Sequence, residues 1–158
     1  MYSDVFCKVY NEFGWNYYPE IFGEQLLKWL EAKNLHPKTA MDLACGTGIL
    51  CGILDRAGIE ASGMDFSSGM IAIARENTPH IHYDVADMIT YRPEKRFDLV
   101  TCTGDAINHI GSLSDVKKIF ENVPAHETAE LKRTRLLLAY AYSVSEQNSS
   151  GGIIVTSP

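Results

Sequence analysis

Residues 40–50 read AMDLACGTGIL, an apolar run of strand length followed by a turn that carries Gly46 and Gly48 and then opens a helical pattern. Glycines in such a turn let the backbone approach a ligand closely, and the N-terminus of the following helix presents unpaired N–H groups. A tight strand-to-helix turn without any ligand would use the same glycines. The stretch therefore predicts a βα unit at the start of a sheet, but it does not decide the function by itself.

An acid at the end of the next apolar run favours a ligand site. Asp65 lies 17 residues after Gly48 and closes a strand pattern that begins at Ile59. In this position a carboxylate can accept hydrogen bonds from both hydroxyls of a ribose. The alternative is that Asp65 serves only the N-terminus of the helix that begins near Ser67.

Ribose recognition would also serve a nicotinamide cofactor, so a dehydrogenase or reductase is a second hypothesis. The dinucleotide fingerprint is GxGxxG, whose third glycine allows the helix to pack closely on the strand. From Gly46 the sequence reads GTGILC, so Cys51 takes the third glycine's place and Gly52 comes one residue late. The NAD(P) hypothesis is weakened by this departure.

Strand and helix patterns alternate on both sides of the turn. We expect helices over residues 19–32, 49–56 and 67–76, and another that Ser114 and Asp115 cap and that ends near Pro124. We expect strands over residues 39–43, 59–64, 81–85 and 97–101. This alternation predicts an α/β fold with a parallel sheet between layers of helices. Beyond Pro124 the period is lost, although LLLAYAY (136–142) or IIVTS (153–157) could each supply one strand.

Length and composition narrow the class of protein. The 158 residues suffice for one domain, and a formal net charge of −6 disfavours sequence-independent binding to nucleic acid. No apolar run approaches the length of a membrane span, and the N-terminus lacks the pattern of a secretory signal. The four cysteines form no CxxC pair, which favours reduced thiols and disfavours a zinc site. We therefore expect a cytoplasmic protein without a metal centre or membrane partner.

Four motifs occur in order: MDLACGTG (41–48), GMDFSSGMIAIAR (63–75), YDVADM (83–88) and FDLVTCTGDAINHI (97–110). Together they resemble the Rossmann-like, class I S-adenosylmethionine-dependent methyltransferases, over about Tyr10 to Val123. The resemblance implies a three-layer fold around a mainly parallel, seven-stranded sheet. It also implies a single domain over residues 1–158, with an N-terminal helical lid (1–35), a cofactor-binding core (36–123) and an atypical tail (124–158). Because the tail does not match the strands that complete the family's sheet, we expect a fold that is incomplete at its C-terminal end. A truncated or vestigial cofactor-binding domain without transferase activity is therefore an alternative to an active enzyme.

The resemblance also assigns S-adenosylmethionine contacts to residues of all four motifs. Asp65 would hold the ribose hydroxyls with Phe66 beside the adenine, and Asp87 would accept a hydrogen bond from the adenine amine. Ala44 replaces the first glycine of the family's acid-x-Gly-x-Gly-x-Gly turn, which narrows the space beside the methionine part. Met70 is equally well read as a core residue, and Asp87 as a turn acid. The implied cofactor-binding set is Tyr10, Trp15, Ala44, Gly46, Gly48, Asp65, Phe66, Met70, Asp87, Met88, Cys102 and Thr103.

The catalytic candidate is His109, which follows the fourth strand where an acceptor would enter. Methyl transfer from a sulfonium needs orientation of the nucleophile, and a base only where the acceptor must lose a proton. Asp105 is close enough in sequence to orient the imidazole, although a packing or capping role for His109 is the alternative. The loop lacks the Asn/Asp-Pro-Pro-Tyr/Phe sequence of enzymes that methylate planar amide or base nitrogens. We therefore expect a small-molecule acceptor.

Overall fold

The structure, a computed structural model, describes residues 4–14, 16–123, 137–141 and 152–155. Trp15 and most of the tail beyond Val123 lie outside these residues. The helices are α1 (Asp4–Val9), α2 (Tyr17–Ala32), α3 (Ile49–Arg56), α4 (Ser68–Asn77) and α5 (Leu113–Asn122), with a 3-10 helix η1 (Ala106–His109). The strands are β1 (Thr39–Leu43), β2 (Glu60–Asp65), β3 (His82–Val85), β4 (Leu99–Cys102), β5 (Leu137–Ala141) and β6 (Gly152–Val155).

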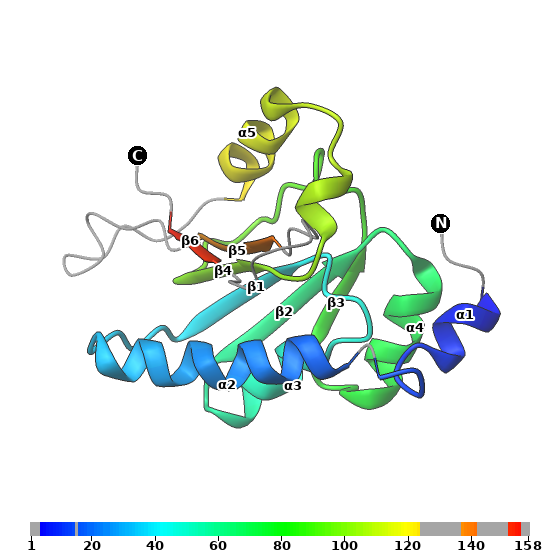
Figure 1. The fold of residues 1–158 in the computed structure, drawn as a ribbon, viewed down its shortest axis with the longest axis horizontal. Coiled ribbons are helices and arrows are strands. Elements are labelled where there is room, and N and C mark those ends of the chain that lie inside the picture. The colour runs from blue at the N-terminus through cyan, green and yellow to red at the C-terminus, as the bar shows by residue number, and fades with distance from the viewer. Residues whose placement is uncertain (1–3, 15, 124–136, 142–151, 156–158) are drawn as a thin grey trace, which may run out of the picture.

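The strands form one sheet with the order β3-β2-β1-β4-β5-β6 (Figure 1). The first five strands are parallel, and β6 pairs antiparallel with β5. In the register Leu43 lies beside Met64 of β2 and Cys102 of β4, so these three strands end at one edge of the sheet. In an open parallel sheet this carboxyl edge is where ligands bind.

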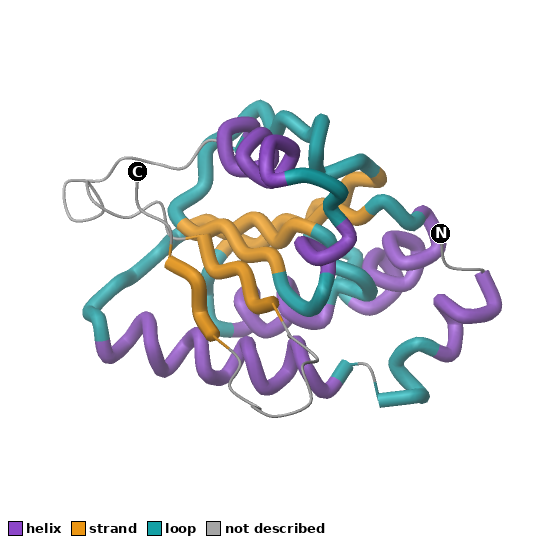
Figure 2. Tube along the Cα trace, turned by 45° about the horizontal axis from the view of Figure 1, so that its top comes forward, coloured by secondary structure: helices purple, strands orange, loops and turns teal. Residues whose placement is uncertain are grey.

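Helices cover both faces of the sheet, which confirms the three-layer α/β prediction. Figures 1 and 2 show α2 and α3 on one face and α5 on the other. Successive residues of β1 point to opposite faces, so Ala40 joins a core with Leu26 and Leu50, whereas Met41 joins a second core with Ile119. Because both faces are covered, β1, β2 and β4 are buried along almost their whole length.

The observed elements differ from the predicted ones mainly at their ends. The helix predicted to be capped by Ser114 is instead capped by Ser112, whose Oγ accepts from the backbone N–H of Asp115 at 3.1 Å. Ser67 caps α4 in the same way, accepting from the backbone N–H of Met70 at 3.4 Å. Both tail segments contribute a strand, and the described residues form six strands where the family pattern implies seven.

Candidate functional site

The turn between β1 and α3 contains three residues in the left-handed backbone region: Ala44 (φ +56°), Gly46 (φ +54°) and Gly48 (φ +77°). The two glycines serve different purposes. A Cβ at Gly48 would lie 2.5 Å from the hydroxyl of the buried Tyr83, whereas a Cβ at Gly46 would meet nothing within 4 Å. Gly48 is thus needed for packing, while Gly46 borders open space with its backbone accessible. Ala44 holds a conformation that an L-residue rarely adopts.

Asp65 lies at the end of β2, against this turn. Its Oδ2 accepts from the backbone N–H of Gly46 at 3.0 Å, and its Oδ1 accepts from that of Ser67 at 2.8 Å. Burial raises the pKa of this carboxyl, and the backbone hydrogen bonds oppose the rise. Each carboxylate oxygen retains acceptor capacity beyond its single backbone bond. Asp65 therefore joins the turn to α4 and can also accept from a ligand.

Asp42 on β1 is the second acidic residue beside the turn, and the sequence suggested no role for it. The residue is 1% exposed; its Oδ1 accepts from the Thr101 hydroxyl at 2.7 Å, while its Oδ2 has no hydrogen-bond partner. Burial raises the pKa of Asp42 to about 7, with the Thr101 hydrogen bond opposing the rise and the charge of Asp65 adding to it. A buried acid of this kind beside a predicted ligand site is a functional candidate.

Thiols pack beneath and beside the turn. Cys45, Cys51 and Cys102 are buried, and the Cys51 thiol donates to the backbone carbonyl of Ser62 at 3.6 Å. Burial raises the pKa of Cys102, as do the charges of Asp42 and Asp65. Because the thiolate is the reactive form, Cys102 is a small packing residue near neutral pH, and only its backbone could serve a ligand.

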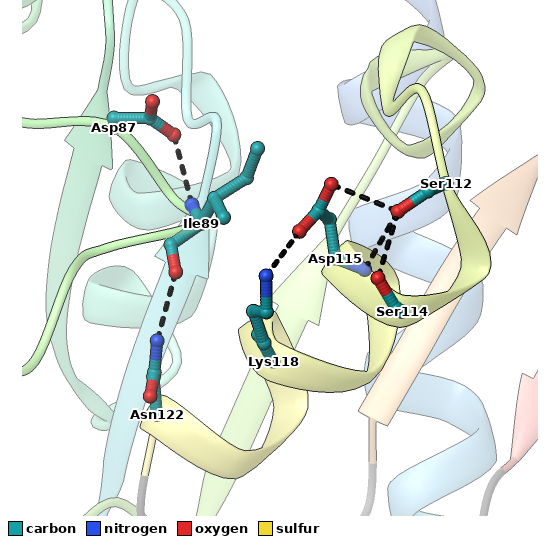
Figure 3. Close-up of polar contacts among 7 residues, drawn as sticks. All are labelled: Asp87, Ile89, Ser112, Ser114, Asp115, Lys118 and Asn122. Atoms are coloured by element: carbon teal, nitrogen blue, oxygen red, sulfur yellow. Dashed lines mark hydrogen bonds and ion pairs between the residues drawn. The ribbon is translucent and has the colours of Figure 1, made fainter.

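The loop after β3 carries Asp87 and is attached to α5 (Figure 3). Asp87 Oδ1 accepts from the backbone N–H of Ile89 at 2.9 Å, and the Ile89 carbonyl accepts from Asn122 Nδ2 at 2.8 Å. At the N-terminus of α5, the Asp115 carboxylate accepts hydrogen bonds from the Ser112 hydroxyl and from Lys118 Nζ. Asp87 is exposed, so it is both a turn acid and an available acceptor, and its neighbour Met88 is half-buried.

The two predicted adenine neighbours on the β2–α4 segment have opposite surroundings. The Phe66 ring is 59% exposed, so its face is available for stacking. Met70, in the first turns of α4, is 1% exposed and contributes to packing. A contact of Met70 with the cofactor stays a prediction.

The N-terminal segment reaches the glycine turn through a residue that sequence reasoning missed. Asn11 Oδ1 accepts from the Thr47 hydroxyl at 2.9 Å, and the Cys7 thiol lies 3.7 Å from the Ser67 hydroxyl. These contacts place Tyr10, the neighbour of Asn11, in the segment that contacts the turn. The sequence signal that could have found Asn11 is its position beside Tyr10.

The end of β4 is much more open. Thr103 follows the strand and is half-buried, and η1 then leads to His109. His109 Nε2 lies 3.1 Å from Asp105 Oδ2, and the two side chains are 70% and 66% exposed. The structure therefore brings together the predicted base and its orienting acid. No group of three or more metal-ligating side chains occurs among residues 4–14, 16–123 and the two tail strands.

Comparison with known proteins decides the family. A family model described as a methyltransferase domain matches residues 40–126, which is more than half of the chain. The chain belongs to this methyltransferase family. The matched region begins in β1 and contains the glycine turn, Asp42, Asp65 and the His109–Asp105 pair.

Individual relatives agree with this assignment. The methyltransferase domain is 34% identical over 93 residues to the dTDP-3-amino-3,6-dideoxy-alpha-D-glucopyranose N,N-dimethyltransferase of Streptomyces fradiae, covering 57% of this chain and 36% of that protein. An S-adenosylmethionine-dependent methyltransferase from Clostridium acetobutylicum is similar in structure, with 28% identity, a TM-score of 0.60 and coverage of 64% and 43%. DesVI of Streptomyces venezuelae shares the fold at a TM-score of 0.72 and 16% identity, over 90% of this chain and 59% of its own.

The chain thus spans between 36% and 59% of the length of these proteins. In the described part of the methyltransferase domain, no helix is long and apolar enough to cross a membrane.

Proposed function

We propose that this domain binds S-adenosylmethionine at the carboxyl edge of β1 and β2 and transfers the methyl group to a small-molecule acceptor beside the end of β4. The observation that carries the proposal is the Asp65 carboxylate, which is held by backbone N–H groups against an open glycine turn. Residues 36–123 would form the cofactor-binding core, and residues 1–35 would form its lid.

The residues at this edge fit the chemical parts of the cofactor. The remaining acceptor capacity of Asp65 suits ribose hydroxyls, and the exposed ring of Phe66 suits the face of adenine. The exposed carboxylate of Asp87 suits the adenine amine, and the backbone N–H of Met88 would donate to a ring nitrogen. Gly46 leaves room beside the turn for the methionine part, and the Ala44 methyl group narrows that room.

The cofactor would supply an electrophilic methyl group on a sulfonium, which leaves as a neutral thioether. The work left to the protein is therefore to orient the acceptor and to exclude water. His109 accepts the acceptor's proton where one must be lost, and Asp105 holds the imidazole in position. The N-terminal segment, which contacts the turn through the Asn11–Thr47 hydrogen bond, would act as the lid that limits access of water.

The acceptor is proposed to be a small molecule with a nitrogen or oxygen nucleophile. The Streptomyces fradiae relative is named for an amino-sugar nucleotide, and the exposed His109–Asp105 pair after β4 is accessible to a molecule of that kind. The buried free thiols, Cys7, Cys45, Cys51 and Cys102, support a reducing, cytoplasmic setting.

Transfer of a labelled methyl group tests this function. The protein is incubated with methyl-labelled S-adenosylmethionine and a panel of amino sugars, sugar nucleotides and hydroxylated aromatics. We expect label in at least one product, and we expect His109→Gln to lower that yield without weakening cofactor binding. Tight cofactor binding with no labelled product from any acceptor class would favour the vestigial alternative.

A further inference from the structure

The turn that follows β3 carries two of the proposed adenine contacts, Asp87 and the backbone N–H of Met88. Its shape is set by hydrogen bonds within the turn: the backbone N–H groups of Thr90 and Tyr91 both donate to the Asp87 carbonyl, at 3.0 and 2.8 Å. The Thr90 hydroxyl donates to the same carbonyl at 3.3 Å. Because these bonds are internal, they leave the position of the turn on the molecule to other contacts.

A buried amide on α5 holds this turn from outside. Asn122, the last residue of α5, is 8% exposed, and its Nδ2 donates to the Ile89 carbonyl at 2.8 Å (Figure 3). The backbone N–H of Ile89 in turn donates to Asp87 Oδ1 at 2.9 Å. Ile89 thus has one hydrogen bond to the adenine acid and one to α5. Fixing the Ile89 backbone orients the Asp87 carboxylate, whose Oδ2 can still accept from a ligand.

Apolar packing places the turn against the same helix. Met88 and Ile89 pack on the core that contains Ile119 and Val123. Apolar contacts are non-directional, so they keep the turn near α5 without fixing its orientation. A hydrogen bond is directional and weakens steeply when its geometry is distorted, and a buried amide is costly to leave unpaired. The Asn122 amide therefore supplies the directional contact that packing alone does not.

We propose that Asn122 is a positioning residue for adenine recognition, which acts through Ile89 to hold the Asp87 carboxylate and the Met88 N–H in place for the adenine edge. This inference rests on the proposed function, because it concerns two contacts proposed for that site. Asp87 is exposed, and an exposed side chain loses rotamer freedom when it binds a ligand. Holding the turn in its binding geometry beforehand lowers that cost, so Asn122 should increase the selectivity for adenine.

Replacing the adenine amine tests this role. In S-inosylhomocysteine a carbonyl oxygen replaces the amine and the adjacent ring nitrogen carries a proton, so both proposed contacts are lost. Calorimetric titration with S-adenosylhomocysteine and S-inosylhomocysteine gives the ratio of their dissociation constants. We expect a preference for adenine of about 100-fold in the wild type, since hydrogen bonds to a charged group are lost with inosine. Asn122→Leu keeps the arrangement of side-chain atoms but removes the donor, and it should reduce the preference to about tenfold.

Two control variants on α5 separate positioning from stability. Glu121→Gln changes an exposed residue beside Asn122 and should keep the wild-type ratio. Ile119→Val removes one buried methyl group, so it lowers stability through packing and should also keep the ratio. With an acceptor present, Asn122→Leu should raise KM for S-adenosylmethionine by about tenfold and leave kcat at saturating cofactor unchanged.

The outcomes separate the two proposals. An unchanged ratio in folded Asn122→Leu would overturn the positioning role and leave the proposed function standing. Equal binding of both ligands by the wild type would do the same, because the turn would then not recognise adenine. Absence of binding of both S-adenosylmethionine and S-adenosylhomocysteine would overturn both proposals. If Asn122→Leu does not fold, the ratio is measured in the smaller, polar variant Asn122→Ser, whose donor lies one bond closer to the backbone. An unchanged ratio there would contradict the role of Asn122.

Discussion

The two halves of the site differ in how their functional groups are held. At the ends of β1 and β2, Asp42 and Asp65 are buried or half-buried and fixed by Thr101 and by backbone N–H groups. At the end of β4, Asp105 and His109 are mostly exposed and contact each other. The cofactor half is therefore determined by backbone geometry and packing, whereas the acceptor half is built from side chains that can change without disturbing the core.

The largest expected contrast between the halves is in the pH dependence of stability. Burial raises the pKa of Asp42 from its ordinary 3.8 to about 7, so between these values the folded state binds a proton that the unfolded state does not. Stability is thus highest below the lower value, falls as pH rises through the window, and levels off above the upper one. The fall should amount to roughly 3–5 kcal/mol in the absence of cofactor.

Urea unfolding at several pH values checks this contribution. The difference in unfolding free energy between the wild type and Asp42→Asn should follow the predicted fall. Asp105→Asn, on the exposed half, should show the wild-type slope. A parallel pH dependence for Asp42→Asn and wild type would contradict the buried-acid assignment.

The second contrast lies within the glycine turn. Gly48→Ala should lower stability by about 3 kcal/mol, because the added methyl group meets the Tyr83 hydroxyl and the φ of +77° is unfavourable. The methyl group added in Gly46→Ala meets no atom within 4 Å. This variant should therefore lose stability only through its unfavourable backbone conformation, by about 1 kcal/mol. Thermal unfolding of both variants measures the difference, and equal losses would disprove the assigned packing role of Gly48.

Substitutions in the exposed half of the site should change the rate of methyl transfer and leave cofactor affinity unchanged. His109→Gln should lower kcat by about 100-fold where the acceptor loses a proton, and Asp105→Asn should lower it less. Steady-state kinetics with the identified acceptor measure both. A large loss of S-adenosylmethionine affinity in His109→Gln would show that the two halves are not separate.

Asp65→Ala should weaken S-adenosylmethionine binding by about 1–3 kcal/mol, because a charged acceptor for the ribose hydroxyls is lost. Calorimetric titration of the wild type and the variant at the same pH measures this loss. The variant also removes the acceptor of the Gly46 N–H, so circular dichroism should accompany the titration. Unchanged affinity in a folded Asp65→Ala variant would mean that Asp65 serves only the turn and α4.

The smallest effect is expected at Ala44. Replacement by glycine relieves the left-handed backbone at φ +56°, while glycine increases the entropy of the unfolded chain. We expect a net gain of about 0.5–1 kcal/mol in unfolding free energy, measured by chemical denaturation. A loss of stability would show that the Ala44 side chain packs favourably despite its backbone conformation.

The sequence predicted the cofactor half better than the acceptor half because the former is local. The strand over 39–43 and the helix over 49–56 match β1 and α3, since the apolar period and the glycines fix both. The pairing of Asp42 with Thr101 spans 59 residues and depends on strand register, which no local pattern contains. The hydrogen bond between Asn11 and Thr47 joins segments 36 residues apart, so the sequence near Tyr10 could suggest Asn11 as a candidate but not its partner.

The other differences between the predicted and the observed structure also have physical causes. Ser112 and Ser114 are both capable caps, and only the backbone conformation of Ser112 places its hydroxyl over the N–H of Asp115. The tail lacked a clear period, yet residues 137–141 and 152–155 pair as strands because the open edge of β4 offers a ladder of hydrogen-bonding groups. The role of each predicted cofactor contact, including Trp15 outside the described residues, stays a prediction.

Calorimetric titration of the wild-type protein with S-adenosylmethionine and, separately, with NAD tests the central claim most directly. The β1–β2 edge described above predicts one binding site for S-adenosylmethionine and no measurable heat with NAD. Binding of NAD in the absence of S-adenosylmethionine binding would contradict it.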